Sequence, residues 1–124
     1  MPHRRKILIV EDEPLIAMSL AEMAEELGYE PLGPVMTEPE AVDEAHRQQP
    51  DAILMDIRLA NGGSGLSAAR QIRAVSDTPI VFCTAYAEEH ALRREVVTIT
   101  RARLIEKPVV PTLLGRALAE ATGL

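Results

Sequence analysis

Residues 7–15 read ILIVEDEPL: four apolar residues run directly into three acidic residues and then a proline. A continuous run of Ile, Leu and Val is typical of a strand that is buried on both faces of a sheet. Pro14 suits the first turn of a helix, where its missing N–H is not needed, and Gly28 marks the expected end of that helix. The stretch therefore predicts a buried strand, an acidic turn and a helix. Because carboxylates repel one another, we also expect a positive charge close to the turn.

The alternation of strand and helix repeats along the 124 residues. Four further apolar segments have the length of strands, at residues 30–36, 52–55, 79–83 and 102–105. Helical patterns follow them at residues 37–49, 66–75, 87–96 and 110–121. Thr37 is the expected N-terminal cap of the first of these helices, with Glu40 in capping-box position. Five strands alternating with five helices predict an α/β fold, a doubly wound parallel sheet covered on both faces.

Composition narrows the class of protein. Hydrophobic residues make up 47% of the chain, which is enough for a core, and the net charge of −6 together with only three aromatic residues disfavours nucleic-acid binding. The single cysteine, Cys83, excludes an internal disulfide and is expected to be a small core residue in a reducing compartment. The apolar run near the N-terminus is too short for a signal peptide or a membrane span. We therefore expect a single cytoplasmic domain with no membrane partner.

Polar residues with useful chemistry stand at the ends of the predicted strands. Glu11 and Asp12 follow the first strand, Asp56 the third, Thr84 the fourth and Lys107 the fifth. In open parallel sheets, ligands bind in the crevice at the carboxyl ends of the strands. We therefore expect these five side chains to form one site.

Three converging carboxylates need a cation. Mg²⁺ suits a few carboxylate oxygens and leaves positions for water and phosphate, and Lys107 supplies a fixed ammonium. These groups are the parts that phosphoryl transfer requires, since its catalysis is mostly positioning and charge neutralisation. Asp56 is the expected nucleophile because it has no acidic neighbour in the sequence, and Glu11 and Asp12 are the expected metal ligands.

The arrangement resembles the receiver domain of bacterial two-component response regulators over the whole chain. The resemblance depends on the acidic pair in ILIVEDE, Asp56 after AILM, Thr84 after IVFC, and the pair Lys107-Pro108. It implies a flavodoxin-like (βα)5 fold with strand order 2-1-3-4-5. It also implies one receiver domain over residues 1–124, and we expect no output domain after it.

The resemblance implies roles for the site residues. Asp56 would accept a phosphoryl group from the phosphohistidine of a sensor histidine kinase or a histidine phosphotransfer protein. Asp12 and Asp56 would bind Mg²⁺ directly, Glu11 would bind it through water, and the main-chain carbonyl of Arg58 would be a further ligand. The protein would catalyse its own phosphorylation and slow dephosphorylation, so that it is a signalling protein rather than a turnover enzyme.

Thr84 and Lys107 would each contact a phosphoryl oxygen, and Lys107-Pro108 is a candidate cis peptide by the same resemblance. Receivers usually carry Tyr or Phe three residues before the lysine, where this chain has Leu104. An aromatic residue stands instead at Tyr86, in FCTAY, which is similar to a subgroup of receivers whose fourth strand ends Phe-Ala-Thr-Gly-Tyr. The switch candidates are therefore Thr84, Tyr86 and Leu104, and Tyr86 is equally compatible with a packing role.

A downstream protein target is expected at the surface around the fourth helix, fifth strand and fifth helix, near Val109, Val110, Arg101 and Arg103. A homodimer, a phosphate sink or a relay between kinases is also compatible with the sequence. One alternative is a receiver-like module that binds partners without phosphorylation. A less favoured one is a phosphatase with an aspartate nucleophile, but such enzymes have an acid two residues later, where this chain has Arg58.

Several of these residues also have simpler interpretations. An acidic pair at the start of a helix is favourable to the helix dipole. Asp56 and Thr84 could each cap a helix, and a lysine is usually exposed to solvent. The coincidence of all five at matching strand ends favours the functional interpretation.

Overall fold

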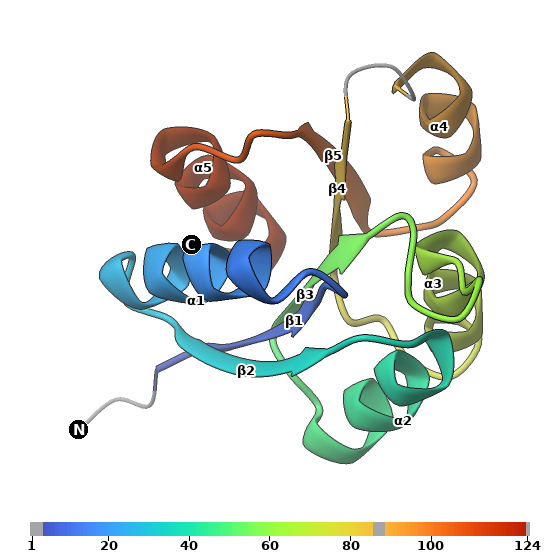
Figure 1. The fold of residues 1–124 in the computed structure, drawn as a ribbon, viewed down its shortest axis with the longest axis horizontal. Coiled ribbons are helices and arrows are strands. Elements are labelled where there is room, and N and C mark those ends of the chain that lie inside the picture. The colour runs from blue at the N-terminus through green and yellow to red at the C-terminus, as the bar shows by residue number, and fades with distance from the viewer. Residues whose placement is uncertain (1–3, 86–88, 124) are drawn as a thin grey trace.

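The computed structural model describes residues 4–85 and 89–123, which contain one parallel five-stranded sheet flanked by five helices (Figure 1). The strand order is β2-β1-β3-β4-β5, and every neighbouring pair is parallel. The strands are β1 Lys6–Val10, β2 Glu30–Val35, β3 Ala52–Asp56, β4 Ile80–Thr84 and β5 Ala102–Glu106. The helices are α1 Pro14–Glu26, α2 Glu38–Gln48, α3 Gly65–Arg73, α4 Glu89–Val96 and α5 Pro111–Thr122. The expected doubly wound fold and strand order are confirmed.

The sheet is covered on both faces, as Figure 1 shows: α1 and α5 lie on one face, and α2, α3 and α4 on the other. Alternate residues of β1 point to opposite faces, so that Ile7 and Ile9 pack with α1 and α5 while Leu8 and Val10 pack with the opposite core cluster. All four are buried because helices cover both faces of the sheet and β1 lies between β2 and β3. The continuous apolar run of β1 is therefore explained by its two covered faces.

Short side-chain caps define where two of the helices begin. The hydroxyl of Thr37 accepts a hydrogen bond from the backbone N–H of Glu40 at 3.3 Å and donates one to the Glu40 carboxylate at 3.0 Å. The expected Thr37 cap of α2 is confirmed, while the Glu40 carboxylate accepts the Thr37 hydroxyl rather than the Thr37 backbone N–H of a full capping box. Ser64 caps α3 in a similar way by accepting from the backbone N–H of Ser67 at 3.2 Å. Pro14 is the first residue of α1, as predicted.

The ends of β2, β3, β4 and β5 differ from the sequence prediction by one residue. Asp56 and Thr84 are the last residues of β3 and β4 rather than the first residues after them, because both still pair with the neighbouring strand. The edge strand β2 is irregular: its register with β1 shifts between Leu8 and Val10, opposite Gly33 with its positive φ. Among the described residues, no helix is long and apolar enough to cross a membrane.

Gly65, the first residue of α3, lies against the backbone of the residue that ends β3. A Cβ atom at this position would collide with the carbonyl oxygen of Asp56, and the Gly65 N–H donates to the Ile57 carbonyl at 2.7 Å. Backbone atoms cannot move aside as the end of a flexible side chain can. The close approach of α3 to β3 therefore depends on the absence of a side chain here.

We expect Gly65→Ala to lower the free energy of unfolding by about 1–3 kcal/mol, the usual cost of overpacking a core. Urea denaturation monitored by circular dichroism measures the change. The control is Gly115→Ala in α5, whose added Cβ meets only the end of the Leu27 side chain at 3.2 Å. That variant is expected to be neutral or more stable by about 0.5–1 kcal/mol, because alanine favours a helix interior. Equal stability of the two variants would contradict the role assigned to Gly65.

Candidate functional site

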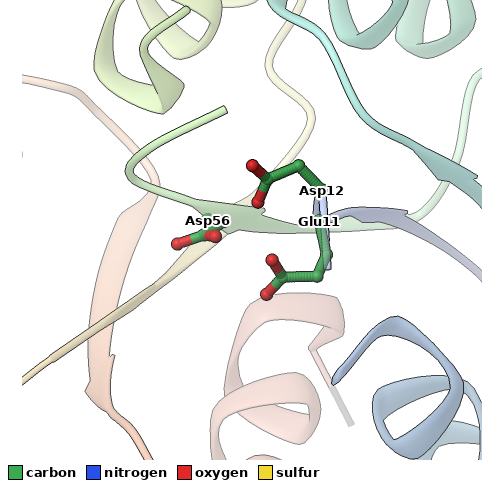
Figure 2. Close-up of side chains that lie close together, drawn as sticks. All are labelled: Glu11, Asp12 and Asp56. Carbon is green, nitrogen blue, oxygen red and sulfur yellow. The ribbon is translucent and has the colours of Figure 1, made fainter. Parts of the chain in front are cut away.

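Three carboxylates meet at the carboxyl edge of the sheet. Glu11 and Asp12 follow β1, and Asp56 ends β3; one carboxylate oxygen from each lies within 4.8 Å of those of the other two. Figure 2 shows the three side chains grouped at this edge. The grouping follows from the pairing of β1 with β3, in which Val10 is the register partner of Met55. Only 1% of Glu11 is exposed, whereas Asp12 and Asp56 are partly accessible.

Lys107 supplies the cation of this cluster among the described residues. Its ammonium donates to Asp56 Oδ1 at 3.1 Å and to Glu11 Oε1 at 3.4 Å. The residue follows β5, and its backbone N–H donates to the carbonyl of Thr84 at 2.6 Å, so that the end of β4 holds it in place. The peptide bond between Lys107 and Pro108 is cis, as expected. The structure thus brings Lys107 to the carboxylates from a strand on the far side of β4.

The charges in this cluster alter the pKa values of its members. The pKa of Glu11 is raised to about 7, chiefly by burial and then by the hydrogen bond and charge of the neighbouring Asp56 carboxylate, against the opposing effects of the Glu13 backbone N–H and the Lys107 charge. Burial on its own would lower the pKa of Lys107. The hydrogen bond that Lys107 donates to Asp56 and the negative charges of Asp56 and Glu11 outweigh burial, and the pKa of Lys107 is therefore raised. Lys107 is charged at neutral pH, and one ammonium does not fully compensate three carboxyl groups.

Thr84 ends β4 beside the acidic cluster. Its neighbour Cys83 is the register partner of Asp56, which places Thr84 one residue beyond that pair. The Thr84 side chain is buried, and its hydroxyl donates to the carbonyl of Ala85 at 3.3 Å. Cys83 is buried as well and is a core residue, as expected. Burial raises the pKa of its thiol to about 12, so it carries no thiolate at neutral pH.

Arg58 lies in the loop that leads from Asp56 to α3. The Asp56 carboxylate accepts the backbone N–H of Ile57 at 2.8 Å, and Arg58 then forms an antiparallel bridge with Ser64. The Leu59 N–H donates to the Gly63 carbonyl at 3.0 Å, which closes the loop. The side chain of Arg58 is exposed, and its peptide group is held two residues from Asp56.

Of the other expected switch residues, Leu104 lies in β5 opposite Phe82, and its partly buried side chain packs against the core cluster under α4. Tyr86 lies outside the described residues. Glu38, the first residue of α2, was not among the predicted site residues; its carboxylate accepts hydrogen bonds from the loop after Asp56 and from α3. In the sequence, Glu38 is recognisable only as an acidic residue in the first turn of a helix, where a negative charge is favourable to the helix dipole.

Comparisons with known proteins agree with this geometry. The family model described as "Response regulator receiver domain" matches residues 7–119. The chain is 39% identical over 117 residues to the phyllosphere-induced regulator PhyR of Methylorubrum extorquens, a match that covers 94% of this chain and 43% of that protein. It is 28% identical to the chemotaxis protein CheY of Thermotoga maritima, over 92% of this chain and 94% of CheY. The chain therefore spans less than half the length of PhyR and most of the length of CheY.

A solved structure carries the same fold with an ion in its site. The receiver domain of the sensor histidine kinase PA1611 from Pseudomonas aeruginosa is 34% identical to this chain, covers 98% of this chain and 100% of its own, and superimposes with a TM-score of 0.84. That structure has a magnesium ion coordinated in its active-site cleft. Together with the family match over residues 7–119, these findings show that the chain belongs to the response regulator receiver domain family.

The raised pKa of Glu11 makes the stability of the metal-free protein depend on pH. Folding favours the protonated form of Glu11, so its contribution is present below the ordinary value of 4.5 and is lost as the pH rises through about 7. We expect the free energy of unfolding of the wild type, relative to Glu11→Gln, to fall by on the order of 1–2 kcal/mol over this window, after allowing for solvent screening. Urea denaturation in EDTA at a series of pH values measures the difference.

The matched control is Glu13→Gln, because Glu13 is an exposed acid of the same turn. Its stability should run parallel to that of the wild type across the same pH range. If the Glu11→Gln curve also runs parallel, Glu11 is not held in its protonated form by the fold.

Proposed function

We propose that this receiver domain accepts a phosphoryl group on Asp56, in a Mg²⁺-dependent reaction, from the phosphohistidine of a sensor histidine kinase or a histidine phosphotransfer protein. The observation that carries the proposal is the contact of the Asp56 carboxylate with Lys107 at 3.1 Å beside two further carboxylates. Asp56 is the reasonable nucleophile because its side chain is partly accessible, whereas Glu11 is buried. The family match supports the same assignment.

The donor set fits a hard divalent cation. Three carboxylates with oxygens within 4.8 Å of one another are typical ligands of Mg²⁺. Burial first, and then the Asp56 carboxylate, raise the pKa of Glu11 despite the Lys107 charge. Asp12 and Asp56 would bind the ion directly, Glu11 through water, and Arg58 through its main-chain carbonyl. When bound, Mg²⁺ neutralises negative charge on the phosphoryl oxygens, which is its usual contribution to phosphoryl transfer.

The remaining residues hold the transferring group. A carboxylate oxygen of Asp56 attacks the phosphorus, the bond from phosphorus to the donor's imidazole nitrogen breaks, and that nitrogen keeps the electron pair. The Lys107 ammonium, already 3.1 Å from Asp56, neutralises charge on one phosphoryl oxygen, and the Thr84 hydroxyl at the end of β4 donates to another. Slow hydrolysis of the acyl phosphate returns the domain to its starting state.

A protein donor is supported by the surface beside the site. An apolar pocket of about 490 Å³ lies between α1 and the segment after β5, and Ile16, Met23 and Val109 line it together with Lys107. On the same helix, Leu15 is 80% exposed. An apolar surface of this kind is suited to a protein that must bring its phosphohistidine to Asp56.

The output would use the surface formed by α4, β5 and α5. A pocket of about 420 Å³ there is lined by Leu104, Val110 and Leu113, and the last two are exposed by 39% and 45%. Phosphorylation would change this surface and its contact with a downstream protein or a second copy. Because Leu104 replaces the usual aromatic residue, the change cannot depend on an aromatic ring at that position. We place the chain in the Phe-Ala-Thr-Gly-Tyr subgroup on the sequence FCTAY.

The first test is intact mass after incubation with acetyl phosphate, with and without Mg²⁺. We expect a gain of one phosphoryl group that requires Mg²⁺ and is absent in Asp56→Asn, because an amide is not a nucleophile at this position. Lys107→Met should lower the rate by about 10²-fold or more, since it removes a preorganised charge at the transferring group. The control is Lys6→Met, whose side chain is exposed at the opposite end of β1.

Equal phosphorylation of Asp56→Asn and the wild type would overturn the assignment of the acceptor. No mass gain from acetyl phosphate or from any histidine kinase would favour a module that binds partners without phosphorylation. Release of inorganic phosphate from simple phosphate esters, at many turnovers per protein, would favour the phosphatase alternative instead.

A further inference from the structure

Glu38 joins α2 to the loop that follows Asp56 and to α3. One carboxylate oxygen accepts the backbone N–H of Ser64 at 3.0 Å. The other accepts the hydroxyl of Ser67 at 2.5 Å and the side-chain amide of Gln71 at 2.7 Å. Three donors from 26 to 33 residues away in the sequence therefore converge on one carboxylate.

The hydrogen bond between Ser64 and Glu38 holds the backbone of the loop that follows Asp56. Ser64 forms the antiparallel bridge with Arg58, and its own hydroxyl caps α3. The return arm of the loop passes so close to α2 that a Cβ at Gly63 would lie 3.1 Å from the Cβ of Glu38. A restraint on Ser64 is thus transmitted through one backbone bridge to the peptide of Arg58.

A second contact holds the outer part of the same loop against the segment before α2. The Ala60 N–H donates to the Met36 carbonyl at 2.9 Å, and Ala60 forms a parallel bridge with Thr37. These backbone contacts fix the tip of the loop, while Glu38 fixes its return arm. The hydrogen bond from Ser67, followed by those from Ser64 and Gln71, lowers the pKa of Glu38, so that it is ionised and a strong acceptor at neutral pH.

We propose that Glu38 is a positioning residue of the phosphorylation site: its carboxylate holds the loop of residues 57–64 so that the Arg58 carbonyl stays in place to complete the Mg²⁺ site beside Asp56. This inference rests on the proposed function, because it concerns the same metal site. Glu38 does not touch the reacting atoms and acts only through the loop.

Glu38 is expected to affect the affinity of the site for Mg²⁺ and not the chemical step. Removing the carboxylate leaves Asp12, Asp56 and Lys107 unchanged, so the chemistry at saturating Mg²⁺ should persist. Without the carboxylate, the loop would have to become ordered when the ion binds, and the free-energy cost of this ordering would weaken Mg²⁺ binding. We expect Glu38→Ala to raise the dissociation constant for Mg²⁺ by about three- to tenfold. This factor is at or below the lower end of the loss of about 10- to 100-fold that is typical when a residue supporting a metal ligand is mutated.

The experiment is a titration of the ¹⁵N-labelled chain with Mg²⁺, followed by backbone amide shifts, and in parallel the rate of phosphorylation by acetyl phosphate at each Mg²⁺ concentration. For Glu38→Ala, the Mg²⁺ concentration at half-maximal rate should rise by the same factor, with the limiting rate within about twofold of the wild type. Hydrogen exchange of the Ser64 amide should accelerate in the metal-free protein, because its acceptor has been removed.

Two variants keep the test specific. Glu38→Gln retains an oxygen for the Ser64 N–H, so it should restore most of the Mg²⁺ affinity that Glu38→Ala loses. Glu40→Ala removes another acid of the same first turn, whose carboxylate contacts Thr37 and not the loop, and it should bind Mg²⁺ as the wild type does. If Glu38→Ala proves unfolded, Glu38→Asp takes its place: the shorter side chain keeps a charge at the start of α2 but withdraws the acceptor from the Ser64 N–H, so it should weaken Mg²⁺ binding. Gln71→Ala leaves the Ser64 contact intact and should bind Mg²⁺ as the wild type does.

The outcomes for the two proposals are distinct. If the wild type is phosphorylated but Glu38→Ala binds Mg²⁺ as tightly as Glu40→Ala does, the positioning role is wrong and the proposed function stands. If the wild type gains no phosphoryl group but Glu38→Ala still weakens Mg²⁺ binding, the positioning role stands and the proposed function is wrong. A fall in the limiting rate without a change in Mg²⁺ affinity, or a wild type that binds no Mg²⁺, would also overturn the positioning role.

Discussion

The ion contacts of Lys107 with Asp56 and Glu11 are the interaction on which the site depends. They join residues from the ends of β1, β3 and β5, and without a cation the three carboxylates of the cluster would repel one another. Burial, followed by the neighbouring Asp56 carboxylate, raises the pKa of Glu11 to about 7 even with Lys107 beside it. Because one ammonium only partly compensates the three carboxylates in the metal-free protein, binding of a divalent cation is favourable there. The electrostatics of the site therefore support the proposed Mg²⁺ chemistry.

The acidic cluster also requires a backbone that approaches closely and does not move. At Gly65, α3 comes so near to the carbonyl of Asp56 that no side chain fits between them. Across the same loop, Glu38 of α2 holds Ser64, and Ser64 pairs with Arg58. Two helices on one face of the sheet thus restrain the segment after the proposed acceptor, so the packing of α2 against α3 is connected to the geometry of the site.

Much of this architecture could be predicted from local sequence patterns. The run ILIV predicted a strand buried on both faces, and Thr37 with Glu40 predicted the start of α2. Both are confirmed, because the residue pattern that marks each of them lies within a short stretch of the chain. The strand ends were less accurate, since Asp56 and Thr84 are kept in their strands by pairing with a neighbour. Glu38 was missed because its three partners lie on a distant helix and loop, and nothing near it in the sequence marks them.

The sequence by itself determined which residue types stand at the ends of the strands, and the parallel α/β pattern required those ends to share one edge. That was sufficient to predict the group of Glu11, Asp12, Asp56, Thr84 and Lys107. Only the tertiary structure decided which carboxylate is buried and which is accessible, that Lys107 contacts Asp56 and Glu11, and which distant side chains hold the loop between β3 and α3. Which carboxylate of the site is buried, and which hydrogen bonds form around it, depends on packing between elements far apart in the chain, and no local pattern of residues encodes either.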